Sequence, residues 1–115
     1  MAIGVFAGIP VRDYNSAAQW YQQLFGSKPA FYPNDIEAVW MMAEDRYVYI
    51  VQAPDRTGGA ANMVWIDSLA KEIERIAERG LTPADIEIHG DVRKYVYRDA
   101  DGNETGMGGN WIEPG

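Results

Sequence analysis

The sequence predicts an α+β fold made of two similar βαβββ modules, whose sheets curl into a half-open barrel with both helices outside. The order strand, helix, three strands occurs twice along the 115 residues. The second helical pattern also follows the first at an offset of 55 residues, and such repeats determine an architecture. The modules span 1–53 and 61–109, and the polar, glycine-rich stretch 54–60 is predicted to link them within a single domain over 1–115.

The first module begins with an apolar, extended run over 2–11. Apolar residues then recur at helical spacing from Tyr14 to Phe25, with Asp13 or Asn15 available as the N-cap and Gly26 at the position of a C-terminal cap. The three remaining strands of this module are predicted at 28–32, 36–42 and 46–52.

The second module repeats this order, with a strand over 62–66 and a helix that Asp67 or Ser68 caps and Gly80 ends. Its other strands are predicted at 85–89, 92–98 and 104–109, before a tail over 110–115. The last two strands meet at Asp101-Gly102-Asn103, where Gly102 accepts positive φ and the flanking side chains can bond their own backbone. The final strand is rich in glycine, so we expect something to approach its backbone closely.

Composition excludes several classes of protein. The chain is 47% hydrophobic and 23% charged, and no apolar run reaches the ~18–20 residues of a membrane span. It contains no cysteine, which excludes disulfides and thiolate sites. The start of the sequence also has no basic segment ahead of an apolar block, so we expect a cytoplasmic protein. A net charge of −7 disfavours nucleic acid and anionic membranes, and either favours cationic partners or serves solubility.

Three segments resemble the vicinal oxygen chelate superfamily, which includes glyoxalase I, extradiol dioxygenases, and fosfomycin and bleomycin resistance proteins. They are Ile9-Pro-Val-Arg-Asp-Tyr, Gln19-Trp-Tyr-Gln-Gln-Leu-Phe-Gly and Tyr97-Arg-Asp-Ala-Asp-Gly-Asn. Trp20 stands where the family has Phe, and Ala100 where it has Pro. The resemblance covers nearly the whole chain and implies a cup between the sheets, as well as a homodimer in which the cup is often completed across the interface.

Metal enzymes of this superfamily hold a divalent ion with His and Glu inside the cup. The resemblance places those ligand positions at Phe6, at Tyr49 or a neighbour on the same strand, near Ala61, and at Gly106. These residues are poor donors, so we expect no metal and no cofactor. The single histidine, His89, has no partner donors at metal spacing. Asp99 and Asp101 are explained by the turn, so no catalytic residue is predicted.

Strand alternation instead predicts an aromatic cup. Phe6 would face inward with Gly8 and Pro10, while Ile9 and Val11 face the helices. Aromatic rings and methionine stack on flat ligands, although the same side chains can also pack together and close the cup. The predicted ligand-binding residues are Phe6, Trp40, Met42, Tyr47, Tyr49, Met63 and Trp65, with Lys94 on the far side and Gly106 beneath.

Three function classes remain open, the third being a subunit or regulatory module whose ligand only stabilises an assembly. The favoured hypothesis is a metal-independent binding protein that sequesters a flat aromatic or cationic, antibiotic-like molecule, as bleomycin resistance proteins do. The alternative is a metal-dependent lyase, isomerase or dioxygenase of the glyoxalase type, which needs a metal or a base in the cup. Glu37 and Glu104 are the only carboxylates near it that the pattern supports, so whether the protein is an enzyme stays open, with binding alone preferred.

Overall fold

The computed structural model describes residues 1–111, so most of the predicted tail lies outside the described part. In the first module the elements are β1 (Val5–Val11), α1 (Tyr14–Phe25), β2 (Phe31–Asn34), β3 (Glu37–Ala43) and β4 (Arg46–Gln52). A 3₁₀ turn, η1 (Pro54–Arg56), precedes the second module. This module contains β5 (Ala61–Trp65), α2 (Leu69–Glu78), β6 (Asp85–His89), β7 (Val92–Arg98) and β8 (Glu104–Asn110). The predicted α+β architecture is confirmed.

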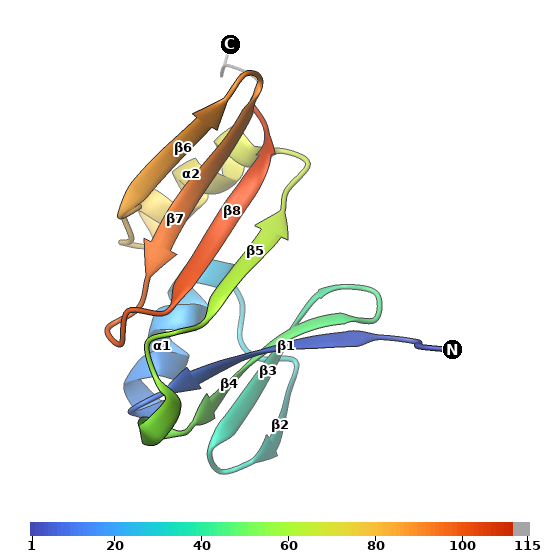
Figure 1. Ribbon diagram of the computed structural model, residues 1–115, viewed down its shortest axis with the longest axis vertical. Coiled ribbons are helices and arrows are strands. Elements are labelled where there is room, and N and C mark those ends of the chain that lie inside the picture. The colour runs from blue at the N-terminus through green and yellow to red at the C-terminus, as the bar shows by residue number, and fades with distance from the viewer. Residues whose placement is uncertain (112–115) are drawn as a thin grey trace.

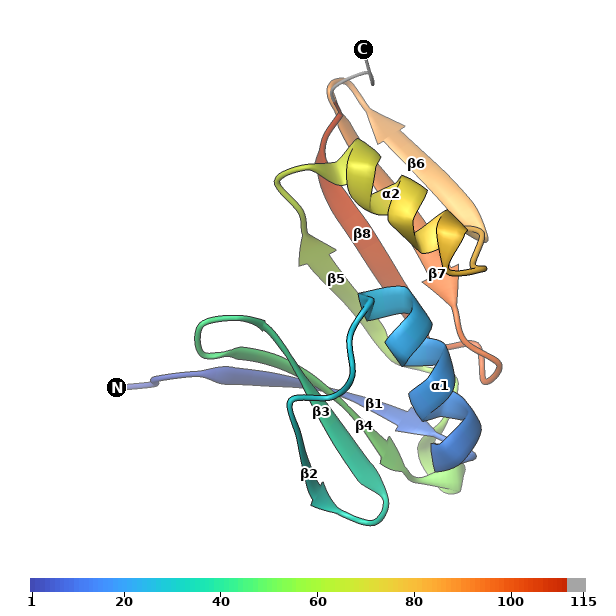
Figure 2. The same cartoon turned by 180° about the vertical axis from the view of Figure 1, so that it is seen from behind.

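Each module forms its own four-stranded sheet, with the same topology in both. The strand orders are β1-β4-β3-β2 and β5-β8-β7-β6. The pairs β1–β4 and β5–β8 are parallel, and the other pairs are antiparallel. The sheets stand at a large angle to each other, with both helices on the same far side (Figures 1 and 2). The barrel is therefore half open, as predicted.

Side-chain and backbone caps define the helix ends. Asp13 accepts a hydrogen bond from the Ser16 backbone N–H, and the hydrogen bonds from Ser16 hold the pKa of this carboxyl below its usual value. Gly26 ends α1 in the left-handed conformation, and Gly80 follows α2 with a φ of 96°. Ser68 is the N-cap of α2 but makes no side-chain capping bond. Neither helix within the described residues is long and apolar enough to cross a bilayer.

The hydrophobic core lies between the sheets and the helices. Ile9 and Val11 of β1 are fully buried, and Tyr21 and Leu24 of α1 pack in the same cluster. The predicted split of β1 into a helix face and an open face is confirmed, because Phe6 on the alternate face is exposed. This arrangement leaves the other face of each sheet free of helices.

The largest differences from the predicted strand boundaries lie at the first two strands, and β3, β5 and β8 shift by one residue at one or both ends. The first strand begins at Val5, where its N–H donates to the Asp45 carbonyl, and the residues before Val5 project from the body (Figure 1). The second strand covers 31–34 instead of 28–32, because Pro29 has no N–H to donate and regular pairing with β3 begins at Phe31.

Candidate functional site

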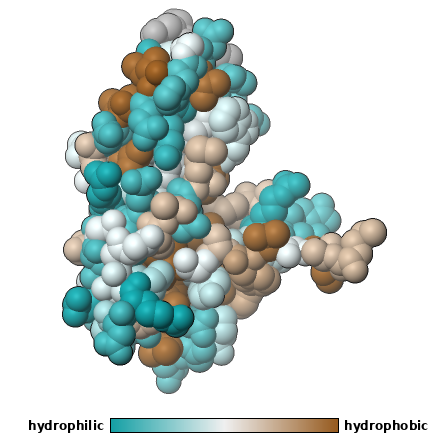
Figure 3. Space-filling view, in the orientation of Figure 1, coloured by the Kyte–Doolittle hydropathy of each residue, from teal (hydrophilic) through white to brown (hydrophobic). Residues whose placement is uncertain are grey.

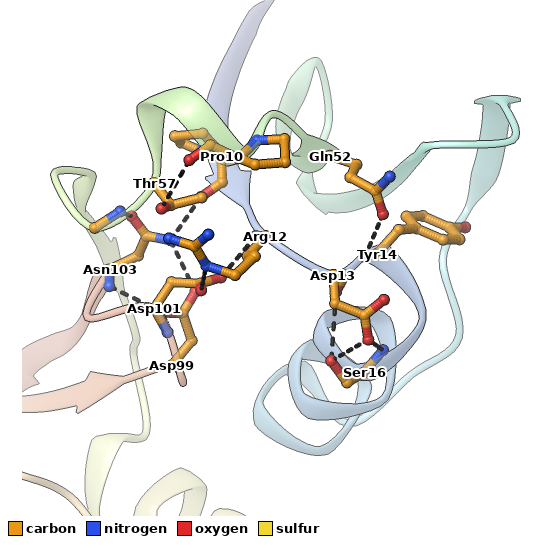
Figure 4. A network of polar contacts seen from close by, with 12 residues as sticks. Pro10, Arg12, Asp13, Tyr14, Ser16, Gln52, Thr57, Asp99, Asp101 and Asn103 are labelled. Carbon is orange, nitrogen blue, oxygen red and sulfur yellow. Dashed lines mark hydrogen bonds and ion pairs between the residues drawn. The ribbon is translucent and has the colours of Figure 1, made fainter.

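The two modules are joined by a buried hydrogen-bond network around Asn103, which has no exposed surface. Its Nδ2 donates to the Pro10 carbonyl at 2.7 Å and to Asp99 Oδ2 at 3.0 Å. Its Oδ1 accepts from the N–H groups of Gly58 and Ala60. The end of β1, the linker and the turn before β8 are thus connected by one side chain (Figure 4).

Asp99 and Asp101 complete this network. Asp99 Oδ1 accepts from the backbone N–H groups of Asp101 and Asn103, and Asp99 Oδ2 accepts from the Tyr21 hydroxyl at 2.7 Å. Burial, followed by the Asp99 carboxylate, raises the pKa of Tyr21 far above its usual value. Asp101 accepts from the Arg12 N–H in the other module, and Asn103 Oδ1 accepts from the linker. The prediction that these two side chains bond their own backbone is therefore wrong, and Asp99 caps the turn instead.

An apolar groove of about 580 Å³ opens at the junction of the modules. One wall belongs to the β1–β4–β3 sheet and the other to the edge strand β5. In the space-filling view, apolar residues gather beside the notch from which the N-terminal end projects (Figure 3). The lining residues are Val5, Ala7, Met42, Ala43, Arg46, Tyr47, Val48, Met63, Val64 and Trp65. Volume and composition both suit a small, largely apolar ligand.

Four of the predicted ligand-binding residues meet in this groove, namely Met42, Tyr47, Met63 and Trp65. The side chains of Met63 and Trp65 are 54% and 56% exposed, although both are large and apolar. In β5 they alternate with half-buried Asn62 and Val64, which places them on the open face of their sheet. They are available for contact with a ligand or a partner.

Phe6 and Tyr49 are not among the groove-lining residues. Phe6 stacks on Tyr47 with ring centroids 4.4 Å apart. The Tyr49 ring lies across Gly8, where an added β-carbon would meet the hydroxyl oxygen at 2.6 Å. Alternation places these rings on the face of the sheet turned away from α1. The predicted aromatic lining is therefore divided between two surfaces within one chain.

The prediction that Trp40 faces the cup is wrong. Trp40 is 1% exposed, packs against Tyr21 and Phe25, and donates from Nε1 to the Ser27 carbonyl at 2.9 Å. In the β3–β4 hairpin Trp40 lies opposite Val48, which is on the helix side of the sheet. Residues directly opposite one another share a face, so this register turns Trp40 into the core.

Lys94 and Gly106 lie together on the open face of the second sheet. An added β-carbon on Gly106 would lie 2.5 Å from Lys94 Cε, so the lysine stem covers this glycine. Gly106 is consequently buried and does not itself form a wall, contrary to the prediction. The expectation of a close approach to the glycine-rich strand is met by Lys94 here, and at Gly108 by Met63 and Trp65.

Sequence reasoning missed six of the groove-lining residues, which are Val5, Ala7, Ala43, Arg46, Val48 and Val64. Alternation places Val5 and Ala7 on the same face as Ile9 and Val11, which suggested burial beneath a helix. That burial applies only where α1 covers the sheet, and the start of β1 extends beyond it (Figure 2). The uncovered end of β1 could have been predicted only by comparing the length of α1 with that of β1.

The superfamily's metal does not fit the residues present. The positions that the resemblance assigns carry a phenyl ring, a phenol lying across Gly8, a methyl group and a glycine beneath the Lys94 stem. Within residues 1–111, no three His, Cys, Asp or Glu side chains come together in a way that could hold an ion. Divalent ions need several imidazole or carboxylate donors, and this donor set does not supply them.

Comparison with known structures identifies the family. A glyoxalase/bleomycin resistance protein from Catenulispora acidiphila shares 38% identity, and the match covers 94% of this chain and 98% of that chain with a TM-score of 0.91. The chain therefore belongs to the glyoxalase/bleomycin resistance protein family, as the resemblance to the vicinal oxygen chelate superfamily implied.

More distant neighbours share the fold alone. A bleomycin-binding protein in complex with bleomycin matches at 18% identity, covering 93% of this chain and 98% of that chain, with a TM-score of 0.73. A lactoylglutathione lyase from Agrobacterium tumefaciens matches at 12% identity, covering 94% and 92%, with a TM-score of 0.72. No family model matches the sequence, and no curated protein matches it either.

Proposed function

We propose that this protein is a metal-independent binding protein for a small, flat aromatic or cationic molecule. The observation that carries the proposal is the pair Met63 and Trp65, each more than half exposed at the border of an apolar groove. An indole ring provides a large, rigid surface on which an aromatic ligand stacks, and methionine adapts to its outline. Desolvation of these surfaces would supply most of the affinity.

Two further observations support this proposal. One structural neighbour is a bleomycin-binding protein in complex with bleomycin, so this fold accommodates such a ligand in at least one relative. The net charge of −7 would also raise the rate at which a cationic ligand meets the protein.

Titration with bleomycin, followed by tryptophan fluorescence, tests the proposal. We expect a saturable change that Trp65→Phe largely removes. Trp20→Phe is the matched control, because Trp20 packs against the core on α1 and is not a groove residue. If neither bleomycin nor a panel of flat aromatic cations alters the fluorescence at any accessible concentration, the proposed function is wrong.

Metal independence is tested separately by elemental analysis of the purified protein. We expect less than about a tenth of an equivalent of any transition metal, and ligand binding that is unchanged by EDTA, because the donors needed for tight binding are lacking. Stoichiometric zinc, nickel or iron would contradict the proposal and support the glyoxalase-type enzyme instead.

We also propose that the protein acts as a homodimer in the cytoplasm. Large apolar side chains are exposed on the open faces of both sheets and at the N-terminal end, including Ile3, Phe6, Met41 and Trp65. A second copy covering these surfaces would bring the rings of one sheet toward the groove of the other chain. Light scattering coupled to size-exclusion chromatography should give twice the chain mass of 12.9 kDa, and a monomer at about 50 μM would refute this part of the proposal.

A further inference from the structure

Lys94 on β7 has an unusual position on the open face of the second sheet. Its stem lies over Gly106 of β8. A β-carbon added to this glycine would lie 2.5 Å from Lys94 Cε, 3.2 Å from Cγ and 3.3 Å from Cδ. Any larger residue at 106 would push the stem away. The missing side chain at 106 is therefore what allows Lys94 to lie along the sheet.

The ammonium group of Lys94 lies between two carboxylates without being saturated by them. Nζ is 3.9 Å from Glu87 Oε2 and 3.6 Å from Glu104 Oε2. Both separations exceed hydrogen-bond length, so these ion pairs leave the three N–H donors of the ammonium available. The Lys94 side chain is 27% exposed, which lets a ligand atom reach it.

The surrounding charges are balanced. Glu104 also lies 3.4 Å from Arg98 Nη2, and Glu87 lies 3.7 Å from His89 Nε2. Two carboxylates thus face the ammonium and the guanidinium, with the imidazole at the edge of the cluster. A ligand cation would meet Lys94 and would have to displace it, whereas a ligand oxygen could accept a hydrogen bond and leave both ion pairs in place.

An apolar surface leads directly to this ammonium. At Gly108, an added β-carbon would lie 3.1 Å from Met63 Sδ and 3.6 Å from Trp65 Cε3, so both side chains lean over β8 from β5. The Lys94 methylenes lean over the same strand from β7 and extend the apolar surface. Two strand spacings, about 10 Å, separate the β5 and β7 backbones, which matches the length of a two-ring aromatic group.

We propose that Lys94 determines ligand specificity by donating a hydrogen bond to an oxygen acceptor on a planar aromatic ligand that stacks against Trp65 and Met63. The ligand class is an aromatic ring system carrying a carbonyl, phenol or carboxylate oxygen. This inference rests on the proposed function and names the polar feature that its ligand must carry. The acceptor oxygen lies at the end of the ring system remote from Trp65.

A pair of matched probes tests the inference. 2-Naphthamide carries a neutral acceptor oxygen, and 2-naphthylmethylammonium carries a cation on the same rings. Wild-type protein should bind the amide more tightly. Lys94→Met keeps the apolar stem and removes the donors, and it should weaken amide binding about tenfold while leaving the ammonium probe unchanged or tighter.

Arg98→Met is the matched control, because it removes another cation paired with Glu104 but not one that lies over Gly106. It should leave the ratio of the affinities for the two probes unchanged. Lys94→Arg retains a donor and should keep the preference for the amide. If the probes bind but Lys94→Met leaves the ratio of their two affinities unchanged, this inference alone is wrong. A wild-type preference for the ammonium probe would also overturn it. If no flat probe binds wild-type protein, the proposed function is wrong as well.

Discussion

Replacing Asn103 with alanine should weaken the attachment between the two modules. The substitution removes four side-chain hydrogen bonds. It leaves the Gly58 and Ala60 N–H groups and the Pro10 carbonyl without this partner. Each net hydrogen bond contributes about 1 kcal/mol, and water can reach the groups near the surface, so we expect a loss of about 2–4 kcal/mol.

Urea denaturation followed by tryptophan fluorescence measures this loss. For a domain of this size the slope is about 1.5 kcal/mol per M, so the midpoint should fall by about 1.3–2.7 M at a fixed protomer concentration. Asn62→Ala is the control, because Asn62 Nδ2 is buried without a hydrogen-bond partner in the described part of the chain. That change should shift the midpoint by less than about 0.3 M. A shift below about 0.5 M for Asn103→Ala, with an unchanged slope, would refute the reasoning.

Three other perturbations have definite expected outcomes. Gly106→Ala should displace the Lys94 stem and reduce the preference for 2-naphthamide in the probe titration, while lowering stability by about 1 kcal/mol or less because the stem is flexible. Trp40→Ala should lower the free energy of unfolding in urea by about 3–5 kcal/mol, and an effect no larger than that of Trp65→Ala would contradict the core position of Trp40. Burial raises the pKa of Tyr97 to about 12, above its value near 10 in the unfolded chain, so stability should be intact below pH 10 and fall by at most about 1.4 kcal/mol per pH unit as the pH rises toward 12. Tyr97→Phe should reduce this alkaline loss, and equal losses in both proteins between pH 8 and 11 would show that Tyr97 is not responsible.

The order of elements could be predicted from the sequence because its signals are local. Period-two alternation, the capping residue Asp13 and glycines with positive φ at 26, 80 and 102 depend on neighbours only a few residues away. Strand boundaries could not be predicted where pairing between strands decides them. β2 begins at Phe31 because of its contacts with β3, which no local pattern contains.

The faces of the central strands could not be predicted in the same way. Alternation states which residues of one strand share a face, but not which face a helix covers. Trp40 and Trp65 are both indoles on short apolar strands, yet one lies beneath α1 and the other is more than half exposed. The difference arises from the register of the β3–β4 hairpin and from the limited length of α1. Both properties depend on contacts between distant residues.

The glycines of β8 show why a correctly identified pattern can still lead to a wrong prediction of which groups lie against the strand. A strand so poor in side chains indicated a bare wall facing a ligand. Gly106 instead accommodates the Lys94 stem, and Gly108 lies beneath Met63 and Trp65. The space left by the missing side chains is thus used to bring an ammonium group and two apolar groups onto one surface. A ligand on this sheet would therefore be recognised by Lys94, Met63 and Trp65, and the glycines would contribute by fixing where those side chains lie.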